Sequence, residues 1–175
     1  DIYAIYADGT DILFGDAFHR IYQIKNNKLL TATPANRLGN TYNRVKVISK
    51  FGHGRFLIGS DASFRMLDTE TMAFEVINDK ASVKDISRLK NGMIVLVGPN
   101  MLPGKSTMGE FFPISDSIPH NRPLSLAQDN KERIWIGTIS GLYRVDHYDY
   151  QQVRRITEVP ADRVDVLHAH EDGTV

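Results

Sequence analysis

The stretch Ser125–Asp146 reads SLAQDNKERIWIGTISGLYRVD and carries the clearest structural signal in the chain. A short strand ends at Gln128–Asp129, and a polar turn separates it from a second strand, Arg133–Thr138. A third strand begins at Gly141. Turns rich in Asn, Asp and Gly suit tight antiparallel connections, because these residues tolerate positive φ. The stretch therefore predicts three short antiparallel strands.

The same pattern recurs along the chain at a regular interval. Four apolar strands each end in a glycine, and these glycines, Gly15, Gly59, Gly98 and Gly137, lie 39 to 44 residues apart. A turn containing Asn, Asp or Gly precedes each strand. A repeat of about 40 residues with several short strands is typical of β-propeller blades. No apolar pattern at helical spacing is long enough to predict a helix. We therefore predict an all-β fold, a β-propeller fragment of about four four-stranded antiparallel blades.

The expected blades occupy about residues 1–33, 42–79, 82–116 and 122–158, and a further blade starts at 163–175. In the third blade we expect a strand at Ser106–Phe111, after a connection, Pro99–Gly104, that is longer than its counterparts. Arg163–His168 is expected to open the further blade as a strand. A blade needs a neighbour on each side, so we expect this chain to be part of a larger propeller protein.

The composition argues against several classes of partner. The 21 Lys and Arg residues equal the 21 Asp and Glu residues in number, so no net field favours nucleic acid or an anionic membrane. The chain has no cysteine, which excludes disulfides, thiolate zinc sites and cysteine nucleophiles. No segment approaches the roughly 18 apolar residues that a membrane-spanning helix needs. We therefore expect neither nucleic-acid binding nor membrane contact by this segment.

Residues 133–146, RIWIGTISGLYRVD, resemble the repeat of the two-component regulator propeller family, in which a turn precedes an IWIGT-like strand and a GLYRYD-like strand follows. The other three repeats keep the strand and its glycine but lack the tryptophan, and the repeat at 83–98 also lacks the threonine and the second glycine. The resemblance implies the extracytoplasmic sensor region of a bacterial hybrid two-component receptor, many of which respond to oligosaccharides. It also implies a periplasmic location, a homodimeric parent receptor, and a membrane span and a histidine kinase outside this chain.

The expected strand order places two kinds of loop on one face of the propeller: the connections between blades, and the loops between the second and third strands of each blade. Binding residues concentrate in loops carried on a rigid scaffold. An Asn or Asp followed by Arg recurs at three connections between blades. The guanidinium fork suits a sugar or a carboxylate, because it donates several hydrogen bonds in fixed geometry. The candidate ligand-binding residues are therefore Tyr42, Asn43, Arg44, His120, Asn121, Arg122, Asp162 and Arg163.

A structural role is the alternative for these residues, with each Arg tying its own blade to backbone carbonyls of the neighbouring blade. Among the aromatic residues, Tyr42 and Phe18 are candidates for stacking on a sugar, and Tyr42 is favoured by its loop position. Trp135 and Tyr143 lie within the strands of the strongest repeat, and we expect both to pack in the core.

Two further motifs match known sites only in part. Val97–Thr107 resembles a phosphate-binding loop, but five residues separate Gly98 from Gly104 where the motif has four, and the sequence that follows is strand-like. His168 and His170 form a candidate metal pair without an evident third ligand. No Ser/His/Asp or paired-carboxylate arrangement stands out. We therefore expect no catalytic residue, no metal and no cofactor.

Three functions remain open from the sequence. The leading hypothesis is a non-catalytic sensor segment that binds an oligosaccharide or another small ligand and acts with the remaining blades and domains of the same receptor. The second is a propeller scaffold that binds another protein, or a second copy, through a loop face. The third, a propeller lyase or lactonase, would need a central metal or an acid–base cluster drawn from several blades.

Overall fold

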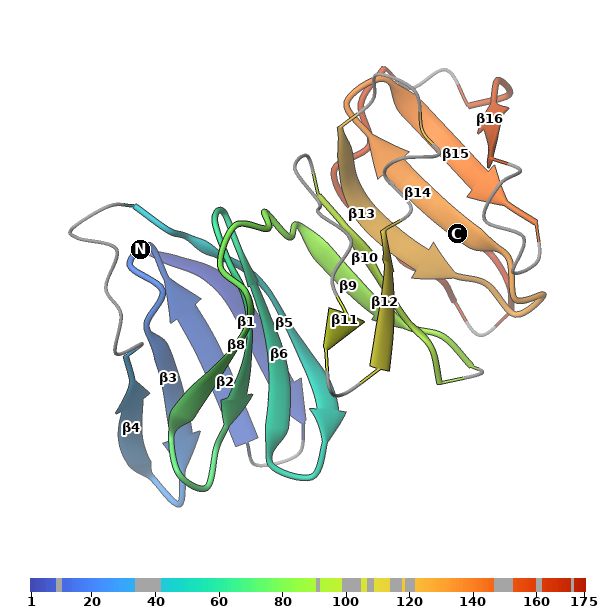
Figure 1. Ribbon diagram of the computed structural model, residues 1–175. Helices are drawn as coiled ribbons and strands as arrows, with labels where there is room; N and C mark the ends of the chain where they lie inside the picture. The colour runs from blue at the N-terminus through green and yellow to red at the C-terminus, as the bar shows by residue number, and fades with distance from the viewer. Residues whose placement is uncertain are drawn as a thin grey trace. The chain divides into compact units, whose positions relative to one another are not determined.

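The computed structural model describes residues 1–8, 11–33, 42–90, 92–98, 105–106, 109–113, 118, 122–146, 153–159, 162–170 and 172–175. Within these ranges the chain forms sixteen strands in four four-stranded sheets and no helix (Figure 1). The all-β prediction is therefore confirmed. The sheets divide between two compact units, residues 1–83 and residues 84–175. Over the described part of the chain, no helix has the length and apolar character that crossing a membrane requires.

Unit 1 contains two antiparallel sheets in which the strands follow one another in chain order. The first sheet consists of β1 (Ile2–Asp8), β2 (Asp11–Asp16), β3 (Ile21–Lys25) and β4 (Lys28–Ala32). The second consists of β5 (Val45–Gly52), β6 (Arg55–Ser60), β7 (Phe64–Asp68) and β8 (Ala73–Asn78). Asn26 and Asn27 form the β3–β4 turn with φ of 51° and 59°, a conformation that asparagine tolerates. Each sheet is thus an up-and-down blade.

The core of unit 1 contains side chains from both sheets. Leu13 and Ile21 of the first sheet and Ile58 and Leu67 of the second are fully buried in one cluster. Alternate residues of a strand point to opposite faces, so a single face of each sheet supplies these side chains. Burying one such side chain stabilises the fold by about 1.5–3 kcal/mol. The packing of one blade on the next is therefore the main source of stability in this unit.

The other face of the first sheet is apolar as well. Ile5 and Leu29 lie on it and are 70% and 60% exposed. The same repeat positions in the second sheet are Ile48 and Phe74, which pack in the core of unit 1. The repeat therefore places apolar side chains on both faces of a blade, as expected for sheets stacked one after another.

The glycine at the end of the second strand of a blade makes room for the chain that enters the next blade. A Cβ at Gly15 would lie 2.5 Å from Cβ of Val45, and a Cβ at Gly137 would lie 2.6 Å from the carbonyl oxygen of Val164. The amide of Val164 also donates to the carbonyl of Thr138 at 2.9 Å. A larger residue has no space at this crossing, which is the physical reason for the strand–glycine repeat.

Unit 2 contains the third and fourth sheets. The third consists of β9 (Asp85–Arg88), β10 (Ile94–Val97), β11 (Lys105–Ser106) and β12 (Gly109–Pro113). The fourth consists of β13 (Pro123–Gln128), β14 (Ile134–Thr138), β15 (Gly141–Val145) and β16 (Val153–Ile156). The fourth sheet contains the stretch from which the fold was predicted, and it is antiparallel throughout.

The third sheet departs from the expected blade. Its order is β11-β12-β10-β9, and β12 pairs with β10 in parallel. The single strand expected at Ser106–Phe111 is replaced by two short strands, β11 and β12, which pair antiparallel with each other. A hairpin produces an antiparallel neighbour, whereas a parallel neighbour needs a longer crossover. Between β10 and β12 the chain contains β11 and is longer than a hairpin turn.

The segment after the fourth sheet is only partly as expected. Arg163–His168 was expected to be a strand, but none of its residues belongs to one in the structure. The amide of Val164 nevertheless bonds to Thr138, the position at which Val83 bonds to Ser60 in unit 1. The segment thus makes the first contact of a further blade, but among the described residues it has no second strand with which to form a ladder.

Candidate ligand-binding site

The loop between β2 and β3 is fixed by one carboxylate. Oδ1 of Asp16 accepts hydrogen bonds from the amides of Phe18 at 2.8 Å and Arg20 at 3.0 Å. Its Oδ2 accepts one from Nε of Arg20 at 2.6 Å. Burial acts to raise the pKa of Asp16, but these hydrogen bonds outweigh it and hold that pKa below its ordinary value. Asp16 therefore stays ionised at neutral pH and fixes the conformation of the loop through these hydrogen bonds.

Within this loop, consecutive side chains point in opposite directions. His19 has φ of 61°, a left-handed conformation that is uncommon for a residue other than glycine. Its side chain is only 4% exposed, whereas that of Phe18 before it is 46% exposed. The left-handed backbone thus turns the imidazole into the protein and leaves the phenyl ring at the surface. Such conformations persist only where the surrounding contacts hold them.

His19 is held from the second blade by Asn43 and Ser63. Nδ2 of Asn43 lies 3.0 Å from Nδ1 of His19, and Oγ of Ser63 lies 3.1 Å from the same nitrogen. Oδ1 of Asn43 accepts the amide of Ala62 at 3.0 Å, and the amide of Asn43 donates to the carbonyl of Ala17 at 2.9 Å. We name His19, Asn43 and Ser63 the buried polar cluster. It joins the loops of the two blades of unit 1.

The hydrogen bonds of this cluster assign the protonation state of His19. Because Oδ1 of Asn43 is an acceptor, its Nδ2 is the donor, so Nδ1 of His19 accepts and the proton of the neutral ring lies on Nε2. Burial, and after it the charge of Arg65, lower the pKa of His19 to about 4, although Asp16 opposes the shift. Nε2 is buried and has no hydrogen-bond partner among the described residues. The imidazole is therefore neutral at pH 7.

Two aromatic rings lie at the surface beside the cluster. The rings of Phe18 and Tyr42 have centroids 5.4 Å apart and an interplanar angle of 36°. Tyr42 is 70% exposed. The guanidinium carbon of Arg20 lies 5.4 Å from the centroid of the Phe18 ring. Nε of Arg44 donates to Asp61 at 2.7 Å. We name Phe18, Arg20, Tyr42 and Arg44 the aromatic patch.

Of the candidates predicted in unit 1, the structure brings Tyr42 and Asn43 together with Phe18 and His19, while the side chain of Arg44 contacts Asp61 and Tyr3. Tyr42 and Arg44 are exposed, and Asn43 between them is buried with its amide engaged in the polar cluster. Asn43 is thus committed to contacts within the protein, whereas the side chains of Tyr42 and Arg44 reach the surface.

The other predicted candidates lie in unit 2. His120 and Asn121 lie outside the described residues. Arg122 is exposed, and its carbonyl accepts the amide of Ile139 at 3.2 Å. Asp162 is exposed, and Arg163 donates from Nε and Nη2 to Asp165 at 2.7 to 3.0 Å. The side-chain bonds of Arg44 and Arg163 go to carboxylates. At the connection that contains Arg122, it is the backbone carbonyl of this residue that bonds to the loop containing Ile139.

Sequence reasoning missed a motif that occurs twice. Asp129 accepts Nε of Arg133 at 2.6 Å and Nε1 of Trp135 at 2.8 Å, as Asp16 accepts Arg20 and the hydroxyl of Tyr22 at 3.3 Å. The shared spacing, Asp-x-x-x-Arg-x-aromatic, is visible in the sequence and was the available signal. The indole nitrogen thus bonds to Asp129. Trp135 itself is only half-buried and is not part of the core cluster of unit 2, and the guanidinium carbons of Arg133 and Arg144 each lie 5.4 Å from the centroid of its ring. The expectation that Trp135 packs in the core is therefore wrong, whereas Tyr143 does pack there.

The buried carboxylate of Asp85 connects the third and fourth sheets of unit 2. It accepts the amide of Leu126 at 2.7 Å and that of Ile86 at 2.8 Å. Burial raises the pKa of Asp85, although both hydrogen bonds oppose the shift. Its two oxygens each have a backbone donor, so the role that the geometry supports is structural.

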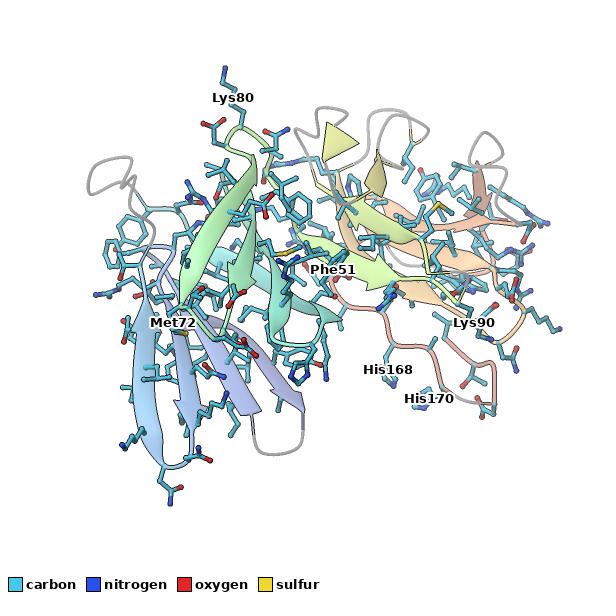
Figure 2. The ribbon with its side chains drawn as sticks, turned by 60° about the horizontal axis from the view of Figure 1, so that its bottom comes forward. Phe51, Met72, Lys80, Lys90, His168 and His170 are labelled. Atoms are coloured by element: carbon cyan, nitrogen blue, oxygen red, sulfur yellow. The ribbon has the colours of Figure 1, made fainter. Side chains whose placement is uncertain are left out.

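The remaining candidates have weaker geometry. Figure 2 shows His168 and His170 close together on the C-terminal segment, with ring centroids 4.9 Å apart. Among the described residues, no three His, Asp or Glu side chains gather as metal ligands would. The phosphate-loop-like segment lies mostly outside the described residues, and the strand β12 follows it where that motif has a helix.

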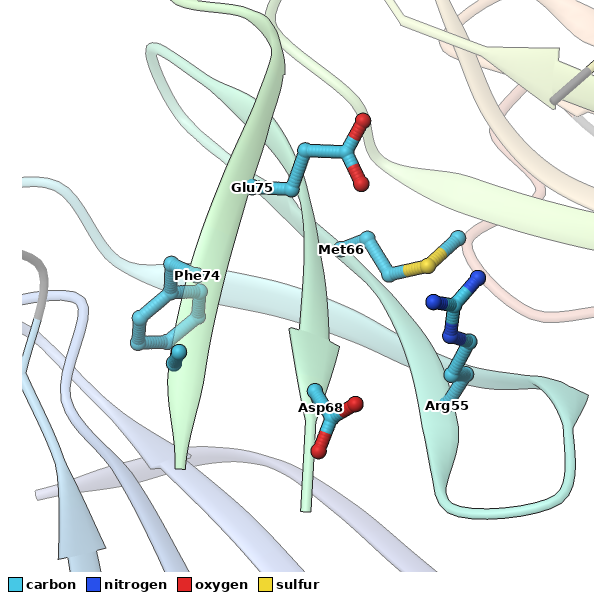
Figure 3. Close-up of a pocket in the computed structure, with 6 residues that line it drawn as sticks. Arg55, Met66, Asp68, Phe74 and Glu75 are labelled. Atoms are coloured by element: carbon cyan, nitrogen blue, oxygen red, sulfur yellow. The ribbon is translucent and has the colours of Figure 1, made fainter. Parts of the chain in front are cut away.

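A hollow of about 140 Å³ lies on the second sheet (Figure 3). Its lining residues are Arg55, Met66, Asp68, Ala73, Phe74 and Glu75. Asp68 is already committed to the β7–β8 turn, where it accepts the amides of Glu70 and Thr71 at 2.9 Å. This turn connects the third and fourth strands of the blade, so the hollow lies at the opposite end of the strands from the aromatic patch.

A family model described as two component regulator propeller matches residues 117–140. These residues overlap the repeat from which the fold was predicted, and the match confirms the resemblance. No curated protein sequence matches the chain.

The fold is similar to those of two extracellular domains from B. thetaiotaomicron, each described as part of a hybrid two-component system. One is 18% identical, with a TM-score of 0.73 over 99% of this chain and 25% of the other. The second is 16% identical, with a TM-score of 0.68 over 93% of this chain and 22% of the other. The β-propeller domain of Swd1 from Myceliophteria thermophila is 14% identical, with a TM-score of 0.62 over 94% of this chain and 61% of that one. The chain thus spans about a quarter of the first two relatives, and the likeness shows a β-propeller fold.

Proposed function

We propose that this chain is the propeller portion of the periplasmic sensor domain of a hybrid two-component receptor. In this proposal the domain binds an oligosaccharide and passes the signal to a histidine kinase elsewhere in the receptor. The segment itself carries out no catalysis. The observation that carries the proposal is the regulator-propeller repeat at 117–140 within a chain of propeller blades.

The loops of unit 1 are consistent with a binding role. The aromatic patch offers two exposed rings and two guanidinium groups on a backbone held by the buried polar cluster. Signalling requires that the ligand bind one arrangement of the receptor more tightly than another, because a ligand shifts an equilibrium only by its differential affinity. Loops that join neighbouring blades are well placed for this, since small changes in blade packing alter their geometry.

The proposal is tested by titrating the intact receptor region with a panel of oligosaccharides in a calorimeter. We expect saturable binding of at least one oligosaccharide. A variant carrying Arg44→Ala, Arg122→Ala and Arg163→Ala removes the exposed guanidiniums of the three predicted connections and is expected to weaken that binding. Absence of saturable binding across a broad panel would remove the support for oligosaccharide sensing. Capture of a protein partner through the same loops would favour a scaffold instead.

A further inference from the structure

We propose that the aromatic patch, Phe18 and Tyr42 with Arg20 and Arg44, is a binding site for a neutral pyranose ring, and that the buried polar cluster holds its two aromatic rings in place. This inference rests on the proposed oligosaccharide sensing and goes further in naming the site and the charge class of the sugar.

The first step is the exposure of the two rings. Phe18 and Tyr42 are 46% and 70% exposed and contact each other at the surface. An apolar side chain left in water forgoes about 25 cal/mol for each Å² that it fails to bury. Neighbouring exposed aromatics on a rigid loop therefore mark a contact surface more often than isolated ones do. A sugar ring that covered both would recover this free energy.

The second step is preorganisation. The amide of Asn43 bonds to Ala17, and a parallel bridge joins Phe18 to Asn43, so the backbones beneath the two rings are tied to each other. His19 holds a left-handed φ of 61° and is locked by Asn43 and Ser63. Ordering loops and side chains on binding costs free energy, and a backbone already ordered avoids part of that cost. A strained residue held by its surroundings is a common feature of ligand sites.

The third step is the chemistry of the ligand. A pyranose presents an apolar face of C–H groups and an edge of hydroxyl groups. The aromatic rings fit the face, and the guanidinium N–H groups of Arg20 and Arg44 can donate to the hydroxyls. Arg44 donates its Nε to Asp61, its guanidinium carbon lies 5.8 Å from the centroid of the Tyr3 ring, and its side chain is 44% exposed.

The fourth step is charge. Each guanidinium of the patch already faces a carboxylate, Arg20 facing Asp16 and Arg44 facing Asp61. A uronate or sulfate group arriving at the patch would meet these two carboxylates as well as the cations. It would therefore gain little from the Arg residues while losing its hydration. A neutral sugar has no such cost.

The test is an array of neutral and acidic oligosaccharides applied to the intact receptor region, followed by calorimetry on those that bind. The variants are Phe18→Ala/Tyr42→Ala, Tyr42→Ala alone and Tyr42→Phe. The matched control is Leu29→Ala, which removes an exposed apolar side chain from the far end of the same blade. Circular dichroism and the thermal midpoint establish that each variant is folded.

We expect neutral oligosaccharides to bind, with at least a tenfold loss in Phe18→Ala/Tyr42→Ala, a smaller loss in Tyr42→Ala, and no change in Tyr42→Phe or Leu29→Ala. Neutral binding that survives the double substitution would overturn the inference and leave the proposed function standing. Binding confined to uronate or sulfated sugars would do the same. No binding of any sugar by the wild-type protein would overturn both.

Discussion

At the scale of single residues, the environment of His19 is the feature that sequence could not foretell. The sequence shows a histidine in a loop, and its burial follows from contacts with Asn43 and Ser63, more than twenty residues away along the chain. Tyr42 and Phe18, in contrast, are the candidates for stacking on a sugar that the sequence offers, Tyr42 because of its loop position, and both are exposed. Local sequence thus indicated the exposure of Tyr42, while long-range contacts decided which polar side chains are buried.

Acid should weaken the fold through His19. Its pKa is about 4 in the folded chain against 6.5 in the unfolded chain, so only the unfolded chain takes up this proton between those values. His19 therefore contributes its full stabilisation above pH 6.5. The free energy of unfolding falls by about 3 kcal/mol as the pH falls to 4. Protonation would also turn Nδ1 from an acceptor into a donor facing the Asn43 amide. Urea denaturation at a series of pH values measures this.

The matched variants for this measurement are His19→Asn and His53→Gln. Asparagine tolerates positive φ, so His19→Asn removes the proton site with little backbone strain. We expect its free energy of unfolding to depend less on pH between 6.5 and 4 than that of the wild type. His53 is exposed, and His53→Gln is the control for replacing a histidine at the surface. Equal slopes in all three proteins would contradict the role given to His19.

Asp129 should matter far more than an exposed aspartate of the same sheet. Its carboxylate is buried and accepts hydrogen bonds from the amides of Lys131 and Arg133 and from the side chains of Arg133 and Trp135. Asp129→Ala leaves these donors unpaired and is expected to cost about 2–4 kcal/mol in denaturant unfolding. Asp146 is 45% exposed and pairs with the less exposed Arg144, and Asp146→Ala should cost less than Asp129→Ala, about 1 kcal/mol. Similar losses for the two would contradict this account of the turn.

At the scale of elements, the strand–glycine repeat was the part of the sequence that predicted most of the fold. Gly15, Gly59 and Gly137 lie where the chain entering the next blade crosses, so these residues mark a contact between elements in the sequence itself. No comparable residue pattern in the sequence marks the parallel pairing of β10 with β12. A tight turn makes neighbouring strands antiparallel, but residue type alone does not specify where the chain returns after a longer connection.

Gly15→Ala should therefore destabilise unit 1. The added methyl group would lie 2.5 Å from Val45, and relieving this overlap is expected to cost about 1–3 kcal/mol. Gly52→Ala is the matched control, because nothing lies within 4 Å of its Cβ position. Thermal unfolding that shows no difference between Gly15→Ala and Gly52→Ala would refute the close crossing.

At the scale of the whole molecule, periodicity predicted a propeller while the ligand had to be inferred by resemblance. A ring of similar blades hosts many functions, so the fold alone does not specify one. Of the predicted Asn-Arg and Asp-Arg connections, Asn43–Arg44 lies beside the β2–β3 loop, where the structure adds the buried polar cluster and the carboxylates of Asp16 and Asp61. The buried polar cluster comes from contacts between blades, which no single repeat encodes, whereas each carboxylate pairs with an Arg of its own blade.

The most direct test of sensing is kinase autophosphorylation of the full receptor in membranes, measured with and without an oligosaccharide that binds the sensor region. The account predicts that the sugar changes the phosphorylation level of the wild-type receptor. It also predicts that Phe18→Ala/Tyr42→Ala loses this response, while Leu29→Ala keeps it. A phosphorylation level that stays the same across saturating concentrations of every bound sugar would contradict the claim that this propeller is a sensor.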